Sequence, residues 1–337
     1  MVSRKVDIVV LTVIGQELSA VKSALDIQET PDNRIKISGS NTTYLYGEIF
    51  SERIQKSYSL ALGCIGSPGN PNSSSATTEA ISEFEPKLLV LVGIAAGIKG
   101  TLRLGEVVFA ERIVGYESAT LDRLKDGIQI VKPRTEMVTV PNGINQSVVF
   151  YLADKNQNQN RLNSSFTSIG GNFPTLSNED RSHLQERNII QEIEIDRCTI
   201  ASGEKLIKDP TVLQNIRDNL HGRVKAGEME ATGFAGACNR MNKDWLVIRG
   251  VSDFGDPYKS DVFQPLASQT AATVLADFLK HGIDLPSNHQ HPERGNNEKI
   301  SSVALEIKLP ERGNNEEISS ILMASYLCFA KRSKEAQ

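Results

Sequence analysis

AGEMEATGFAGACNRMNKDWLVIRGVSDFGD, the stretch from Ala226 to Asp256, predicts a helix followed closely by a buried strand. Small residues are frequent from Glu228 to Met241, a segment with helical spacing. The run from Trp245 to Val251 is short and apolar, which is typical of a strand covered on both faces. A helix joined to a buried strand in this way is a building unit of α/β domains.

The same alternation continues along the rest of the chain. Short apolar runs predict further strands at Val6–Val13, Ser59–Ile65, Lys87–Val92, Val107–Val114 and Ile193–Ser202. Helical spacing predicts helices at Glu17–Leu25, Ser73–Phe84, Asn178–Gln191 and Val262–Lys280. We therefore expect an α/β fold in which helices sandwich a mixed or parallel central sheet.

Acidic residues stand at both ends of the opening stretch. Glu228 and Glu230 flank Met229 where the helix is predicted to begin, and Asp253 follows Ser252 directly after the predicted strand. We interpret them as two carboxylate sites of the kind that a reaction on a sugar–base bond needs. A structural role is the alternative, because acids are favoured in the first turn of a helix and a strand-end carboxylate can cap the next turn.

Composition limits the classes of function. The 337 residues include 39% hydrophobic residues, enough for a large core, and the net charge of -4 argues against binding to a nucleic-acid backbone. No run reaches the ~18 apolar residues that a membrane span needs, and the amino-terminal residues lack a signal-peptide pattern. We expect a cytoplasmic protein. The histidines and cysteines have no metal-ligand spacing, so neither a metal nor a cofactor is implied.

The sequence changes character near residue 285. We expect one catalytic domain over residues 1–285, with a polar, loop-rich insertion at about 121–192, and a tail over 286–337. In the tail, PERGNNE begins at Pro292 and again at Pro310, a short tandem duplication. The tail then has apolar residues on one side of a possible carboxy-terminal amphipathic helix, which we expect to dock on the body or on a partner protein: Ile318, Ile321, Leu322 and Phe329.

Four segments, in this order, resemble the nucleoside phosphorylase superfamily: VDIVVLTVIGQELSAVKSAL from Val6, PKLLVLVGIAAGIKGTLRLGEVVFA from Pro86, ASGEKLI from Ala201, and the GEMEA to VSDFGD region. Within it they are most similar to the methylthioadenosine/S-adenosylhomocysteine nucleosidases. The resemblance covers roughly residues 5–283. It implies a three-layer fold with a twisted mixed sheet that is partly closed into a barrel. It also implies a reaction that breaks the bond between a purine and its ribose.

The resemblance assigns roles to three acids. Asp253 is expected to protonate the departing purine at N7 and to accept from the exocyclic amine, which favours adenine. Glu230 is expected to accept from the ribose 2′- and 3′-hydroxyls while Met229 packs against the sugar. Glu17 corresponds to the glutamate that activates water. Each group would stabilise a different part of the transition state, and interactions that strengthen in the transition state are those that accelerate a reaction.

Other residues are expected to shape the substrate site. The Ser202-Gly203 turn with Leu206 and Ile207 should frame the adenine, although these nucleosidases often place an aromatic residue where Leu206 stands. A small-residue turn after a strand, which includes Ile94 and Ala95, should permit close backbone approach to the ligand. Ser252 stands beside the proposed acid. This set completes the predicted substrate-binding residues.

Leu91 and Ile94 favour hydrolysis over phosphorolysis. Phosphorylases place a basic residue and a hydroxyl residue at this turn to hold phosphate, and neither of these side chains can donate a hydrogen bond. An unpartnered buried phosphate costs several kcal/mol, so we expect water as the nucleophile. The loss of the hydroxyl leaves the positioning of that water to other groups.

The chain also resembles nucleosidase-type effector domains of bacterial antiviral systems, some of which release adenine from ATP. We therefore hypothesise an adenine nucleotide or nucleoside substrate, with ATP favoured and with five candidate phosphate contacts: Lys99, Arg103, Arg112, Lys132 and Arg134. The alternatives are a phosphate-dependent nucleoside phosphorylase, a methylthioadenosine/S-adenosylhomocysteine nucleosidase, and a non-catalytic adenine-nucleotide sensor. By analogy with the family we expect a homo-oligomer.

Overall fold

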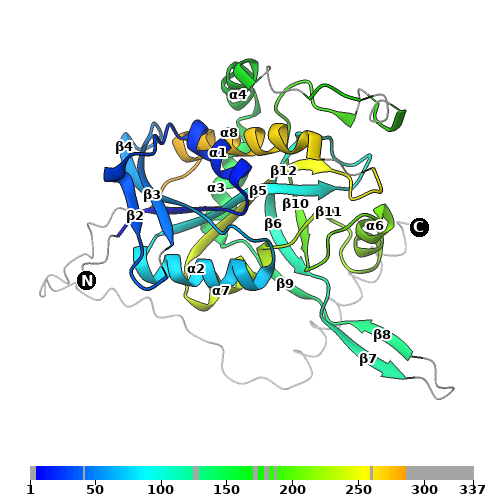
Figure 1. Ribbon diagram of the computed structural model, residues 1–337. Coiled ribbons are helices and arrows are strands. Elements are labelled where there is room, and N and C mark those ends of the chain that lie inside the picture. Colours follow the sequence, from blue (N-terminus) through cyan, green and yellow to red (C-terminus); the bar gives the residue numbers. More distant parts are fainter. Residues whose placement is uncertain are drawn as a thin grey trace, which may run out of the picture. The chain divides into compact units, whose positions relative to one another are not determined.

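A twisted sheet organises the part of the chain that the computed structural model describes, which comprises residues 5–40, 42–123, 129–169, 174–177, 182–185, 188–258 and 261–285 (Figure 1). Within these residues the sheet has ten strands. They are β1 (Ile8–Thr12), β2 (Arg34–Lys36), β3 (Thr43–Ser51), β4 (Lys56–Cys64), β5 (Leu88–Gly97), β6 (Val107–Gly115), β9 (Glu136–Thr139), β10 (Ile195–Ser202), β11 (Val224–Glu228) and β12 (Asp244–Asp253).

One part of the sheet closes on itself. The strands follow the order β11-β10-β6-β12-β5-β1-β4-β3-β2, and β11 also pairs with β5. This second pairing is antiparallel and joins Ala226 to Gly97 and Gly227 to Ala96. Strands β5, β12, β6, β10 and β11 therefore form a ring, and the rest of the sheet continues from it as an open extension. The expected mixed, partly barrel-like sheet is confirmed.

Helices cover both faces of the sheet, which gives the expected three layers (Figure 1). On one face lie α2 (Asn70–Phe84) and α7 (Ala231–Arg240), packed side by side. On the other lie α1 (Gly15–Ala24) and α8 (Gln264–His281); α4 (Lys155–Ile169) packs against α8, and α3 (Asn142–Ala153) contacts both α4 and β12. Helix α6 (Pro210–Asn219) packs against β11.

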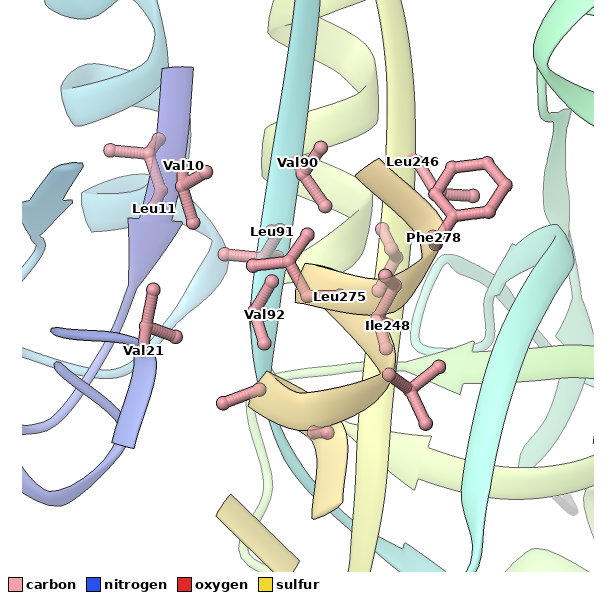
Figure 2. Packing of buried hydrophobic residues seen from close by; sticks show 14 of the residues in the cluster. Val10, Leu11, Val21, Val90, Leu91, Val92, Leu246, Ile248, Leu275 and Phe278 are labelled. Atoms are coloured by element: carbon pink, nitrogen blue, oxygen red, sulfur yellow. The ribbon is translucent and has the colours of Figure 1, made fainter. Parts of the chain in front are cut away.

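The main core lies between α8 and the central strands (Figure 2). Leu275 and Phe278 of α8 are completely buried, as are Leu246 and Ile248 of β12. The strand residues are β-branched or leucine on both faces, which is why these runs read as continuous apolar segments and not as alternating ones. This packing fixes β5 and β12 side by side, so that their carboxyl ends reach the same edge of the sheet.

The segment 121–192 differs from the loop-rich insertion that we expected. It contributes β9, which joins the main sheet beside β6, and the helices α3 and α4. Tyr151 of α3 and Arg161 of α4 both donate to the Asp277 carboxylate of α8, at 2.7 and 2.8 Å. The polar residues of Lys155–Ile169 therefore belong to a helix, which Arg161 anchors to α8.

Two further expectations are corrected. The helix expected over 178–191 is not continuous in the residues described there, since Leu184 and Gln185 are not helical and Ile189 forms a bridge with Leu104. The small-residue turn expected after Val92 belongs to β5, which continues to Gly97. The tail 286–337, with its duplication and its predicted helix, lies outside the described residues, so the boundary near 285 stays a prediction.

A two-stranded hairpin, β7 (Ala119–Arg123) and β8 (Gln129–Pro133), extends away from the body (Figure 1). Leu121 and Val131 face each other across it, with exposed fractions of 68% and 63%. A lone hairpin of this kind is marginally stable in water, so its exposed apolar pair is a candidate contact surface.

Candidate active site

A cavity of about 300 Å³ lies where β1, β5, β11 and β12 end. Strands β1, β5 and β12 are parallel, so their carboxyl ends meet at this edge, the usual place for a ligand in such sheets. The lining comprises Val13, Ile14, Glu17, Pro68, Ile94, Ala95, Ala96, Lys205, Leu206, Ile207, Gly227, Glu228, Met229, Glu230, Ser252, Asp253, Asp261 and Gln264.

All but two of the predicted site residues line this cavity. It brings together Asp253, Glu17, Glu230, Met229, Leu206, Ile207, Ile94, Ala95 and Ser252 from five separated parts of the sequence. Leu206 stands at the opening and is 58% exposed, whereas Ile207 lies next to Gly255 and is partly buried. The sequence prediction therefore grouped residues that are far apart in the chain.

Ser202 and Gly203 lie behind the lining. The Ser202 hydroxyl accepts from the Thr232 N–H at 3.1 Å and donates to the Asn70 side-chain oxygen at 3.2 Å. The Gly203 N–H donates to the Glu228 carbonyl, and a side chain on Gly203 would overlap the ring of Tyr116. Both residues support the wall of the cavity from outside it.

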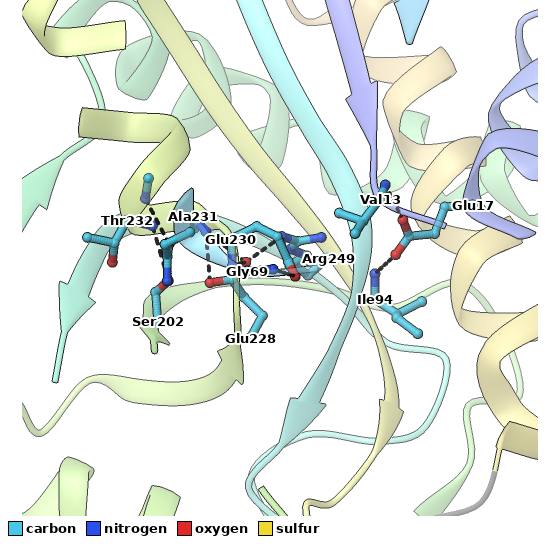
Figure 3. A network of polar contacts seen from close by, with 12 residues as sticks. Val13, Glu17, Gly69, Ile94, Ser202, Glu228, Glu230, Ala231, Thr232 and Arg249 are labelled. Carbon is cyan, nitrogen blue, oxygen red and sulfur yellow. Dashed lines mark hydrogen bonds and ion pairs between the residues drawn. The ribbon is translucent and has the colours of Figure 1, made fainter. Parts of the chain in front are cut away.

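Glu17 is held at the start of α1 by three backbone donors, of which Figure 3 labels Val13 and Ile94. One carboxylate oxygen accepts from the N–H groups of Val13 and Ile14, at 2.7 and 3.1 Å, and the other accepts from Ile94 at 2.9 Å. Glu17 is thus an acid in the first turn of a helix, where acids are favoured, and it also lines the cavity. Burial raises the pKa of Glu17, although Arg249 and the three N–H groups favour the anion.

Arg249 of β12 joins the two acids of the Glu-Met-Glu triplet (Figure 3). Its Nη2 forms ion pairs with the carboxylates of Glu228 and Glu230, the second at 3.1 Å. Glu230 also accepts from the Gly69 N–H at 3.2 Å, and Glu228 accepts from the N–H of Ala231 at 3.0 Å. Glu228 therefore stabilises the start of α7, which is the structural alternative considered for the acids of this triplet.

The ionisation of Glu230 is set by competing effects. Burial raises its pKa to about 7, and the negative charges of Glu228 and Glu17 act in the same direction. The Arg249 guanidinium and the Gly69 N–H lower it. A carboxylate with a pKa in this range changes its charge near neutral pH, which is a common property of functional sites.

Asp253 ends β12 and is 5% exposed. Its carboxylate accepts from the Ser252 hydroxyl at 2.9 Å and from the Gly255 N–H at 2.8 Å. Gly255 has a φ of 60°, a left-handed conformation that glycine adopts without strain. The strand-end capping that we considered as the alternative is thus present, and it fixes a carboxyl group that lines the cavity.

Sequence reasoning missed Arg249 because a charged residue inside an apolar strand gave no motif. The signal that points to it is Gly93 on the neighbouring strand, with which it is in register. A Cβ on Gly93 would overlap both Arg249 Nη1 and a Glu17 carboxylate oxygen, so both groups lie against the bare backbone there. Among the described residues, Arg249 Nη1 and Nε have no hydrogen-bond partner.

The residues that should separate hydrolysis from phosphorolysis lie as follows. Leu91 is completely buried inside β5, and Ile94 lines the cavity. The backbone N–H of Ile94 already donates to the Glu17 carboxylate. Neither side chain presents a donor to an anion in the cavity.

None of the five candidate phosphate contacts lines the cavity. Lys99 and Arg103 line a separate polar hollow, and Arg112 contacts His221 at 3.0 Å. Lys132 pairs with Asp122 in the hairpin, next to which Arg134 lies. The lysine in the described lining is Lys205, which forms an ion pair with Glu117 at 3.2 Å.

A metal-binding cluster and a membrane-spanning helix are both absent from the described residues. These residues contain no group of three or more histidine, cysteine or acidic residues placed to hold a metal ion. Their helices also include none with the length and apolarity of a membrane span.

The sequence matches known proteins over most of its length. Residues 7–280 match the model of the phosphorylase superfamily. An ATP nucleosidase Cap17 of Escherichia coli is 35% identical over 278 residues, which are 82% of this chain and 51% of that protein. A 5′-methylthioadenosine/S-adenosylhomocysteine nucleosidase of Marinomonas sp. is 23% identical over 63% of this chain and 77% of its own. The chain thus spans about half the length of the Cap17 relatives.

Solved structures show the same fold. A 5′-methylthioadenosine/S-adenosylhomocysteine nucleosidase from Neisseria meningitidis superposes with a TM-score of 0.55 at 20% identity, over 81% of this chain and 98% of that one. The futalosine hydrolase of Helicobacter pylori superposes with a TM-score of 0.54 at 16% identity, over 81% and 96%. At these identities the likeness concerns the fold.

Proposed function

The chain belongs to the phosphorylase superfamily, and from that premise we propose that it is an N-glycosidase that hydrolyses an adenine nucleotide or nucleoside and releases adenine. The observation that carries the proposal is the convergence of Asp253, Glu230 and Glu17 on one cavity of about 300 Å³. Cleavage of a purine–ribose bond needs a proton for the base, a grip on the sugar and a positioned nucleophile. Three acids from three elements match these three tasks.

Each acid has an environment that suits its proposed task. Asp253 donates a proton to the purine, held in place by Ser252 and Gly255. Glu230 accepts from the ribose hydroxyls, and its negative charge favours the positive charge that develops at the anomeric carbon. Glu17 accepts a proton from the attacking water, beside the unpartnered Nη1 of Arg249.

Water is the nucleophile in this proposal. The part of the wall formed by Ile94 and Ala95 is apolar, and Arg249, which lies against Gly93, is paired through its Nη2 with Glu228 and Glu230. A phosphate dianion there would meet three carboxylates and no basic side chain from β5, which is electrostatically unfavourable. Water adjoining Glu17 meets no such penalty. A phosphorylase is the alternative, and it requires added phosphate.

ATP is the favoured substrate because of the 35% identity to an ATP nucleosidase. The described lining holds several acids and one lysine, so the triphosphate belongs at the open side of the cavity, where solvent and bound cations screen it. The methylthioadenosine/S-adenosylhomocysteine nucleosidases among the relatives make thioether nucleosides the second candidate.

We also propose a cytoplasmic homo-oligomer that acts as an effector in antiviral defence. An adenine nucleotide substrate would support the cytoplasmic location, and the resemblance to effector nucleosidases supports the role. The exposed Leu121 and Val131 pair on the hairpin supports self-association, because an isolated hairpin gains stability when its apolar face is covered. Light scattering of the wild type and of Leu121→Lys tests it, since the variant should shift the mass toward the monomer.

A substrate panel tests the proposed reaction. The purified chain is incubated with ATP, AMP, adenosine and methylthioadenosine, with and without phosphate, and adenine is measured by chromatography. We expect adenine from at least one adenine substrate without phosphate. Adenine that forms only with phosphate, together with ribose 1-phosphate, would identify a phosphorylase. Calorimetric binding without turnover would identify the sensor.

A further inference from the structure

Helix α7 begins at Ala231 without a cap from its own N-cap residue, Glu230. The first N–H groups of a helix lack partners inside the helix, and the N-cap side chain usually accepts from one of them. The Glu230 carboxylate is instead directed to Gly69 and Arg249. The helix therefore needs acceptors from elsewhere.

Three side chains from three different elements supply these acceptors, one for each of the first three N–H groups of the helix. The pairs are Ala231 N–H to Glu228 of β11 at 3.0 Å, Thr232 N–H to the Ser202 hydroxyl of β10 at 3.1 Å, and Gly233 N–H to the Asn70 side-chain oxygen of α2 at 2.8 Å. Figure 3 shows Glu228 and Ser202 on either side of the start of the helix. The cap is thus assembled by the tertiary fold.

Asn70 is the member that links this cap to the rest of the site. Its side-chain oxygen accepts from both Gly233 and Ser202, and because the Gly233 N–H can only donate, the oxygen of the amide must face it. A Cβ on Gly233 would overlap the Asn70 backbone carbonyl, so the starts of α2 and α7 are in direct contact.

The same contact places a donor for Glu230. Gly69, the residue before Asn70, donates its N–H to the Glu230 carboxylate at 3.2 Å. Asn70 therefore fixes two things together: the start of α7, from which Glu230 projects, and the backbone N–H that orients the Glu230 carboxylate.

We propose that Asn70, acting together with Ser202, is a positioning residue. By capping α7 these two side chains leave the Glu230 carboxylate free to face the substrate ribose. This inference rests on the proposed function, in which Glu230 binds the ribose hydroxyls. Without Asn70, the Gly233 N–H loses its partner, and the carboxylate at the N-cap position becomes its nearest alternative acceptor. Glu230 would then turn from the cavity to its own helix.

Kinetics of three variants test this proposal. For Asn70→Ala we expect KM for the cleaved adenine substrate to rise about tenfold, with a smaller change in kcat, because ground-state and transition-state binding of the ribose weaken together. Asn70→Asp keeps the acceptor oxygen and should recover most of the loss. Thr78→Ala removes an exposed hydrogen bond from the same helix and should behave as wild type.

A double-mutant cycle separates positioning from a general structural effect. Adenosine binding is measured by calorimetry in an Asp253→Asn background, so that the ligand is not consumed, with Asn70→Ala, Glu230→Gln and both. We expect Asn70→Ala to weaken binding about tenfold alone and to add little when Glu230 is already replaced. The same tenfold loss in both backgrounds would overturn the proposal.

The outcomes are distinct from those of the proposed function. If the wild type binds adenosine but releases no adenine, the proposed N-glycosidase activity is contradicted. The double-mutant cycle of adenosine binding then still tests the role of Asn70. An active wild type with an unchanged Asn70→Ala variant contradicts only the present inference. If circular dichroism shows that Asn70→Ala does not fold, Ser202→Ala replaces it, with the same expectations.

Discussion

The guanidinium of Arg249 lies 3.1 Å from the carboxylate of Glu230, and neither side chain is more than 7% exposed. Glu228 shares the same guanidinium nitrogen, so a single buried cation stabilises two buried acids. Burying these three charges costs free energy, and their mutual attraction offsets that cost only while all three are present. Arg249 therefore connects the stability of the fold to the ionisation of the site.

Replacing Arg249 with methionine should destabilise the protein by about 3–5 kcal/mol, because it leaves Glu228 and Glu230 buried without a cation. The loss should be larger at pH 8 than at pH 5, because Glu230, whose pKa burial raises to about 7, is protonated at the lower pH. Denaturant unfolding at both pH values measures it. Arg240→Met, at the exposed end of α7, is the control and should change stability little. An equal loss at both pH values would argue against this charge balance.

On the acidic side of its pH profile, kcat/KM should rise up to about pH 7 and then level off. The reason is that Glu230, with a pKa of about 7, must be ionised to accept from both ribose hydroxyls. The pH profile of Glu230→Gln should lack this limb, at a much lower rate. A wild-type profile that is flat from about pH 5.5 to 7.5 would show that Glu230 does not titrate as described.

Stability should change with pH in the opposite sense. Burial raises the pKa of Glu17, and that of Glu230 from 4.5 to about 7, so the folded state retains protons that the unfolded state has lost. Folding stability from these groups is present below pH 4.5 and falls as pH rises toward 7. Glu230→Gln should make this fall shallower in denaturant titrations. A slope that is identical in the variant would contradict the raised pKa.

Gly93→Ala should reduce both activity and stability, because a methyl group there would overlap Arg249 Nη1 and a Glu17 carboxylate oxygen, and both buried groups would have to move. Adenine release and thermal unfolding are compared in the same preparation. Gly236→Ala is the matched control, since a Cβ at that exposed helical position meets nothing within 4 Å and should leave activity unchanged. Full activity in Gly93→Ala would mean that these two groups are not needed in their observed positions.

The fold was predictable where a segment carries its own periodicity. The apolar runs that contain Val90 and Ile248 form central strands as predicted, because such runs have no solvent-facing side. Strand β11 was missed because it is short and includes Lys225 and Gly227, yet it closes the ring. Helix α4 was missed because its sequence is polar, and α3 was missed although it carries apolar residues such as Tyr151, which packs on α8.

The site was predictable where a residue stands in a motif. Glu17, Glu230 and Asp253 were placed together through the resemblance, and they line one cavity. The role of Arg249 depends on its register with Gly93 in a neighbouring strand, and the role of Asn70 depends on contact between two helix starts. Both are tertiary relationships without a local sequence signal. Ser202 was identified as a site residue, but its hydroxyl caps a helix.

Adenine release by the wild type and by Asp253→Asn, in phosphate-free buffer, tests the central claim most directly. The account predicts that the wild type releases adenine from an adenine nucleotide or nucleoside, and that Asp253→Asn, with its fold intact by circular dichroism, is slower by about two orders of magnitude or more. A folded Asp253→Asn variant that releases adenine at the wild-type rate would contradict it.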